Sequence, residues 1–163
     1  MSVEKRLLIL ATCFVLAACS TTIKTTQQIP QQIRQDIIVK DASVQVADGI
    51  DVPADIPGRL QKALLERAAK HGNGTKPVTL KLTITQFHVA SIVERFWGGA
   101  FVGSNKLDVT VNVVAADGTM LGSYIVQREA NPGGYGIYFD QTQSTINDSA
   151  NGVIAGLYQA DEN

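Results

Sequence analysis

The chain has 163 residues, of which 45% are hydrophobic and 18% are charged, and its formal net charge is −1. This length suits one folded domain, and this composition is typical of a globular protein. The near-neutral charge argues against nucleic acid as a partner, because neutralising phosphates requires a strongly basic surface.

Residues 1–18 have the pattern of a secretory signal peptide. Lys5 and Arg6 form a short basic start, and the run from Leu7 to Ala17 is almost wholly apolar. Such a run is too short to cross a bilayer, which takes roughly 20 apolar residues in a helix. We therefore expect residues 1–18 to be removed on export.

The segment Leu16-Ala17-Ala18-Cys19 resembles the lipobox of bacterial lipoproteins. The resemblance implies that Cys19 is thioether-linked to diacylglycerol and becomes an acylated, palmitate-bearing N-terminus. Several acyl chains together anchor a protein stably in a membrane, whereas one holds it only marginally. Ser20 stands where an Asp would retain a member of that family in the inner membrane, so the resemblance implies the outer membrane, facing the periplasm.

The lipidated cysteine is expected to be followed by a tether and one domain. Cys13 lies inside the signal peptide, so we expect neither a disulfide nor a thiolate site in the folded protein. Residues 19–36 are rich in Thr and Gln and sustain no period of 2 or 3.6, which predicts a flexible segment. A single periplasmic domain is then expected over residues 37–163.

The first half of this domain predicts a strand, a helix and a second strand. Residues 37–46 are rich in β-branched residues, which strands favour. Asp55 stands where it can cap a helix that ends at Gly72. The next segment, residues 77–93, alternates apolar and polar residues in the manner of a half-buried strand, with its apolar positions at Val78, Leu80, Leu82 and Ile84.

The second half predicts a hairpin and a closing helix. Apolar and polar residues alternate again from Leu107 to Val113, and Asp117-Gly118 is a typical turn before a return strand over residues 119–129. A loop over residues 131–139 then leads into the last helix.

That last helix is expected over residues 140–159. Asp140 and Gln143 have the spacing of a capping box at its start. Gly152 and Gly156 either weaken the helix or let its backbone approach the sheet closely.

The predicted order is β-α-β-β-β-α. A right-handed crossover makes the first two strands parallel neighbours, and the last three strands form an antiparallel meander. Both helices can then cover the one apolar face of the sheet. The sequence therefore predicts an α+β fold, a two-layer sandwich with a mixed sheet and both helices on one face.

Few residues have the pattern of a catalytic or metal site. His71 ends the first helix and His88 continues the inward parity of its strand; a catalytic base is one interpretation, and a structural or surface role is the favoured one. Asp48, Asp51 and Asp55 could hold a cation weakly, but turn and cap roles are favoured because the spacing of a calcium loop is absent. We expect no metal, no cofactor and no enzymatic activity.

The segment over residues 94–107, ERFWGGAFVGSNKL, is unusually apolar for a connection between strands and contains the only tryptophan. A phosphate loop is not favoured, because neither the Lys-Ser/Thr pair nor a helix follows the glycines. The segment could close the core, contact a protein partner or cover an apolar ligand, and these interpretations stay open. Since aromatic residues are favoured at interfaces, the candidate partner or ligand surface comprises Arg95, Phe96, Trp97, Phe101, Tyr135 and Tyr138.

The order of LTITQF, Arg95, GGAFVGSNKL, VTVNVVAADGTMLGSYIV and a last amphipathic helix resembles Gram-negative lipoproteins that share a domain of unknown function. More distantly it is similar to YajG-type lipoproteins and to lipoprotein subunits of envelope lipid-transport systems. The resemblance implies an α+β domain without known catalysis.

We therefore expect a non-catalytic binding or scaffold module in an envelope assembly, with a protein partner there. The alternative is a carrier or sensor of an apolar ligand such as lipid. An enzyme acting on glycans is the least favoured interpretation, because the acidic residues cluster in turns.

Overall fold

The computed structural model describes residues 19–71, 73–89, 104–130 and 140–159. Along the chain the elements are β1 (Cys19–Gln27), α2 (Gln31–Arg34), β2 (Ile37–Val46), α3 (Ile56–Ala68), the 3₁₀ turn η1 (Ala69–His71), β3 (Lys76–His88), β4 (Asn105–Ala115), β5 (Met120–Ala130) and α5 (Gln141–Tyr158). No helix among these is long and apolar enough to cross a membrane.

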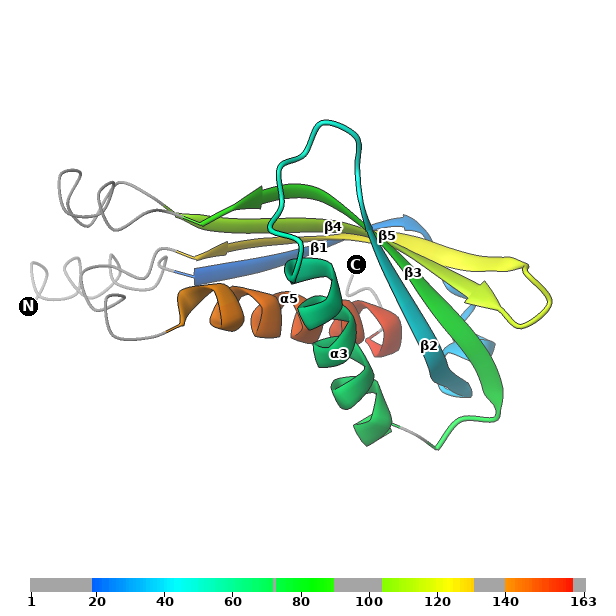
Figure 1. The fold of residues 1–163 in the computed structure, drawn as a ribbon. Helices are drawn as coiled ribbons and strands as arrows, with labels where there is room; N and C mark the ends of the chain where they lie inside the picture. The colour runs from blue at the N-terminus through cyan, green and yellow to red at the C-terminus, as the bar shows by residue number, and fades with distance from the viewer. Residues whose placement is uncertain (1–18, 72, 90–103, 131–139, 160–163) are drawn as a thin grey trace, which may run out of the picture.

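The strands form one sheet in the order β1-β5-β4-β3-β2. β2 and β3 are parallel, as a crossover through α3 requires, and every other neighbouring pair is antiparallel. α3 and α5 pack against each other and cover the same face of the sheet (Figure 1). The predicted two-layer α+β sandwich with a mixed sheet is confirmed.

The core lies between the sheet and these two helices. In β3 the predicted apolar positions from Val78 to Ile84 are buried, and the alternate residues of β4, from Leu107 to Val113, lie beside them. Each fully buried Leu, Ile or Val contributes about 1.5–3 kcal/mol through removal from water. The opposite face carries Thr, Lys, Asn and Asp side chains, which is why no second helical layer is needed there.

The predicted tether over residues 19–36 is wrong for most of its length. β1 pairs with β5 from Cys19 opposite Ala130 to Thr25 opposite Tyr124, and Ile23 packs on the core. Ile29, after the strand, is 4% exposed. Thr-rich segments suit an edge strand, but the pairing depends on the free edge of β5, which is far away in sequence. Local periodicity therefore carries no signal for β1.

The two helix starts differ from each other in how they are capped. Asp55 precedes α3 but makes no side-chain cap bond, and its carboxylate pairs with Arg59 instead. Asp140 caps α5 as predicted, since its Oδ1 accepts a hydrogen bond of 2.9 Å from the backbone N–H of Gln143. The Gln143 side chain turns away from the cap toward Arg59, so the second half of the predicted capping box is absent.

Tyr124 joins β5 to α5 through a buried hydroxyl. Its side chain is 2% exposed, and its hydroxyl donates a hydrogen bond of 2.6 Å to the carbonyl oxygen of Val153. Burial raises the pKa of the Tyr124 phenol above its ordinary value near 10, and the nearby Arg34 offsets only part of that effect. The folded protein therefore strongly favours the protonated phenol.

This predicts that Tyr124 makes the protein less stable in alkali. Above about pH 10 the unfolded chain releases the phenol proton while the folded chain keeps it, so the free energy of unfolding falls as pH rises. Tyr124→Phe is expected to cost about 1 kcal/mol at neutral pH and to make this alkaline fall less steep. Urea unfolding at several pH values measures both effects. An equally steep alkaline fall in the variant would contradict the assignment.

Candidate functional site

Cys19, the residue predicted to carry lipid, lies at one end of the sheet, where the ends of three other strands also lie. Cys19 is opposite Ala130, and Ala130 is opposite Asn105 on the next strand. Lys106 is in turn opposite His88, at the end of β3. We call this the Cys19 end of the sheet. The connections over residues 90–103 and 131–139 both join the described strands at this end.

The candidate partner surface cannot be located in the same way. All of its residues lie outside the described part of the chain, so the surface stays a prediction: Arg95, Phe96, Trp97, Phe101, Tyr135 and Tyr138. The fold shows only where the two segments that carry these residues are attached: both are joined to strands at the Cys19 end of the sheet.

A buried polar cluster lies under the first half of α5, near the same end of the sheet. Asn105 donates a hydrogen bond of 3.1 Å to the Gln141 side chain. Arg128, which is 8% exposed, donates to Asp148 at 2.7 Å and to Thr21 at 3.2 Å. Arg128 therefore ties three elements together. Its inward parity with Tyr124 and Val126 along β5 is the sequence signal that could have revealed it.

On the open face of the sheet, Glu129 lies near this end, opposite Ser20 in β1 and Lys106 in β4. Ser104 donates a hydrogen bond of 2.8 Å to its carboxylate, and Lys106 lies 3.5 Å away. The Ser104 hydroxyl is the main reason that the pKa of Glu129 lies below its usual range. The group is exposed, so the pair orients side chains without adding much stability.

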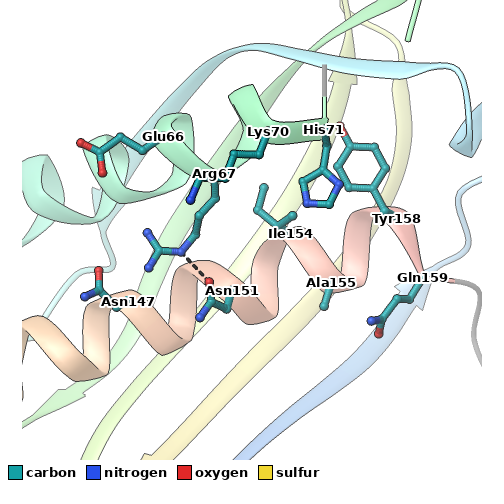
Figure 2. Close-up of a pocket in the computed structure, with 10 residues that line it drawn as sticks. All are labelled: Glu66, Arg67, Lys70, His71, Asn147, Asn151, Ile154, Ala155, Tyr158 and Gln159. Carbon is teal, nitrogen blue, oxygen red and sulfur yellow. Dashed lines mark hydrogen bonds between the residues drawn. The ribbon is translucent and has the colours of Figure 1, made fainter. Parts of the chain in front are cut away.

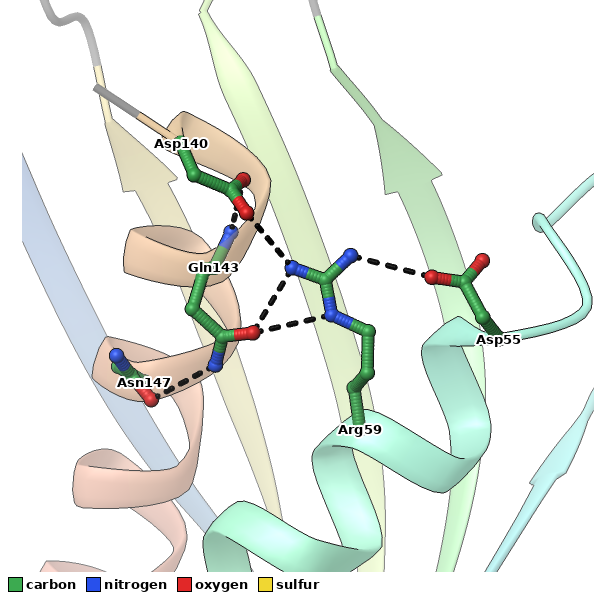
Figure 3. Close-up of polar contacts among 5 residues, drawn as sticks. All are labelled: Asp55, Arg59, Asp140, Gln143 and Asn147. Carbon is green, nitrogen blue, oxygen red and sulfur yellow. Dashed lines mark hydrogen bonds and ion pairs between the residues drawn. The ribbon is translucent and has the colours of Figure 1, made fainter.

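A second polar cluster joins the starts of the two long helices (Figure 3). The guanidinium of Arg59 lies 3.1 Å from Asp55 and 3.1 Å from Asp140, and it donates two hydrogen bonds to the Gln143 side-chain oxygen at 3.0 and 2.8 Å. Gln143 donates in turn to Asn147 at 3.1 Å. Arg59 therefore holds α3 against α5, and its Nε, Nη1 and Nη2 atoms all donate to these partners.

The described surface is hollowed between the C-terminal halves of α3 and α5 (Figure 2). This groove, of about 600 Å³, is lined by Glu66, Arg67, Lys70, His71, Asn147, Asn151, Ile154, Ala155, Tyr158 and Gln159. Arg67 bridges it with a hydrogen bond of 2.5 Å to Asn151 and also donates to the Ala63 carbonyl at 2.9 Å. The rings of His71 and Tyr158 stack with centroids 4.9 Å apart.

The two histidines lie in separate surroundings. His71 is at the end of η1, stacked on Tyr158. The predicted inward orientation of His88 is wrong: a bulge between Ile84 and Gln86 shifts the parity of β3, and His88 is exposed. No group of three or more His, Cys, Asp or Glu side chains with metal-binding geometry occurs among the described residues. Asp48 and Asp51 are exposed in the loop before α3.

α5 lies very close to the sheet at two of its glycines. A methyl group added at Gly152 would lie 2.7 Å from Thr21 and 2.8 Å from Val126. One added at Gly156 would lie 2.6 Å from the Tyr124 ring. At both positions the helix touches the sheet, which gives the lipid-carrier interpretation no cavity along this stretch of α5.

Comparison with known proteins finds solved structures with a similar fold but does not show a family for this chain. No protein-family model and no curated protein matches the sequence. Two solved structures of PelC from Paraburkholderia phytofirmans, both dodecamers and one a point variant, are similar to this chain. The variant matches with a TM-score of 0.50 and 14% identity over 87% of this chain and 100% of PelC. The other matches with a TM-score of 0.52 and 15% identity over 85% and 99%.

This chain shares the fold of PelC. The match spans the full PelC chain, so the likeness concerns the whole domain and not a common sheet motif. At this identity it concerns the fold alone. The resemblance to YajG-type lipoproteins, inferred from the order of sequence motifs, stays a prediction.

Proposed function

We propose that this protein is an outer-membrane lipoprotein that faces the periplasm and acts as a non-catalytic scaffold, assembled from several copies into a ring. The signal peptide and the lipobox ending in Cys19 support the anchor. The likeness to PelC, whose chains are solved as dodecamers, supports the ring. The polar and buried clusters described above serve packing and give no support to a catalytic role.

One observation carries this proposal: β1 begins at Cys19 and pairs with β5 from its first residue. A lipid on Cys19 is then attached directly to the folded sheet and not to a loose tether. The Cys19 end of the sheet lies against the membrane surface in this arrangement. The β4–β5 hairpin lies at the other end of β5, whose eleven residues span about 35 Å.

A ring is compatible with this attachment. In a cyclic assembly every copy is related by rotation about one axis. If that axis is perpendicular to the membrane, all Cys19 residues lie on the same face of the ring. The acyl chains of every copy can then enter the membrane together. In such a ring, the candidate partner surface would contact a neighbouring copy of the chain.

The anchor is tested by Cys19→Ser, with Cys13→Ser as the matched control in the same signal peptide. We expect wild type and Cys13→Ser to sediment with outer membranes and to carry acyl chains detectable by mass spectrometry. Cys19→Ser is expected in the soluble periplasmic fraction with an unchanged circular dichroism spectrum. Acylation of the Cys19→Ser chain, or its retention in the outer membrane as a monomer, would contradict the proposal.

The ring is tested by native mass spectrometry of the detergent-extracted wild-type chain. We expect one closed oligomer of defined copy number, and chemical crosslinking in cells is expected to produce a ladder that ends at the same number. A monomer in both measurements would exclude the ring and would leave the anchor to be judged on its own.

A further inference from the structure

The described lining of the groove between α3 and α5 is positively charged, although the net charge of the chain is −1. Arg67 and Lys70 line it, and Glu66 is its only carboxylate among the described residues. Glu66 lies 4.0 Å from Lys62 on the preceding turn of α3, so part of its charge is already offset. Among the described residues that line the groove, cationic side chains therefore outnumber carboxylates.

The basic residues of the groove are more than the two neighbouring helix C-termini need to offset their partial negative charge. The C-terminal end of a helix carries a partial negative charge, which cations near it offset. Arg67 donates to the Ala63 carbonyl of α3, and Arg34 donates to the Gln159 carbonyl at the end of α5. Both ends thus have a cation of their own. No carboxylate pairs with Lys70 in the part of the chain that the structure describes.

We propose that this groove is a binding site for a small organic anion, whose carboxylate or phosphate is held by Lys70 and Arg67. A charge-assisted hydrogen bond to either group is stronger than a neutral one. Nε and Nη1 of Arg67 already donate to Asn151 and Ala63, so its Nη2 and the Lys70 ammonium are the donors assigned to the anion. The inference is independent of the anchor and of the ring.

The other lining residues suit the polar body of such a ligand. Asn147, Asn151 and Gln159 carry amides that both donate and accept hydrogen bonds. The stacked rings of His71 and Tyr158 add a flat aromatic surface to the lining of the groove (Figure 2). A volume of about 600 Å³ lies in the range of small-molecule sites.

The position of the groove leaves it open to the periplasm in the proposed orientation. Tyr158 hydrogen-bonds to the Ile37 carbonyl at the start of β2, and β2 starts beside Lys76 at the end of the sheet opposite Cys19. A soluble anion can therefore reach the groove while the Cys19 end lies against lipid.

Saturation-transfer difference NMR on the wild-type chain in detergent micelles tests the site with three matched probes. Glucose 6-phosphate, glucuronate and glucose share a ring and differ in carrying a phosphate, a carboxylate or no charge. We expect saturable transfer to at least one of the two anions and none to glucose. Binding of the phosphate alone or of the carboxylate alone would support the site and would identify the group it prefers.

Two variants locate the binding. Lys70→Gln is expected to weaken the anion about tenfold, the effect of losing one charge-assisted hydrogen bond. Lys81→Gln is the matched control, because Lys81 is also an exposed lysine but lies in β3 and does not line the groove. Raising the ionic strength from about 0.1 M to about 1 M, which shortens the Debye length from about 10 Å to about 3 Å, is expected to weaken binding as well.

Three results would overturn the proposal. The first is the absence of saturable transfer to both anions. The second is equal transfer to glucose, since charge would then play no part. The third is an equal loss of affinity in Lys81→Gln and Lys70→Gln, because the anion would then respond to the general charge of the protein and not to this groove.

Discussion

Replacing Gly156 with alanine is expected to lower the free energy of unfolding by about 2 kcal/mol, although alanine is the better helix former. The added methyl group would lie 2.6 and 2.8 Å from two ring carbons of Tyr124. That ring is buried, and its hydroxyl is bonded to the Val153 carbonyl of the same helix, so it has nowhere to move. To accommodate the methyl group, α5 would have to move away from the sheet.

Gly58 provides the matched control for this change. It is also a helical glycine, in α3, but an added methyl group there would meet no atom within 4 Å. Gly58→Ala is expected to raise the free energy of unfolding by about 0.5 kcal/mol through helix propensity alone. Urea denaturation of both variants measures the difference. Two changes of the same sign would contradict the close approach of α5 to β5.

Shortening Ile23 to alanine is expected to cost about 1–2 kcal/mol of stability. Ile23 is opposite Val126 in the β1–β5 pair, and it packs on the core beside the backbone of Gly156. A residue in a flexible tether would tolerate the same change without effect. The stability of Ile23→Ala therefore distinguishes the strand in the structure from the tether that the sequence pattern predicts.

Lys24 is the control for Ile23, since it is the next residue of β1 and its side chain is exposed on the opposite face. Lys24→Ala is expected to change the free energy of unfolding by less than about 0.5 kcal/mol. Hydrogen exchange gives a second measurement, because β1 amides bonded to β5 are expected to be protected. If the β1 amides exchange without protection and Ile23→Ala leaves the free energy of unfolding unchanged, the segment is a flexible tether and not a strand.

Some candidate functional features depend on residues that are neighbours in the sequence, and others depend on contacts between distant parts of the chain. The segment that resembles a lipobox is contiguous, so Cys19 is predicted as a lipidation site from the sequence alone. The groove is made by two helices separated by about half the chain, and neither helix carries a local signal for it. His71 was noted in the sequence as a helix-end residue, but its stacking on Tyr158 depends on how α3 crosses α5. Arg59 likewise gains Asp140 and Gln143 as partners only through that packing.

The sequence by itself determined the layers of the fold, because the alternation in β3 and β4 and the helical stripes in α3 and α5 are local patterns that burial must satisfy. It also determined the turn at Asp117-Gly118 and the cap at Asp140, which depend on neighbouring residues. Only the tertiary structure decided that β1 is a strand, that His88 points outward after a bulge, and that Cys19, the predicted anchor residue, belongs to the sheet. Strand pairing joins residues far apart in the chain, so its energy is not contained in any one segment.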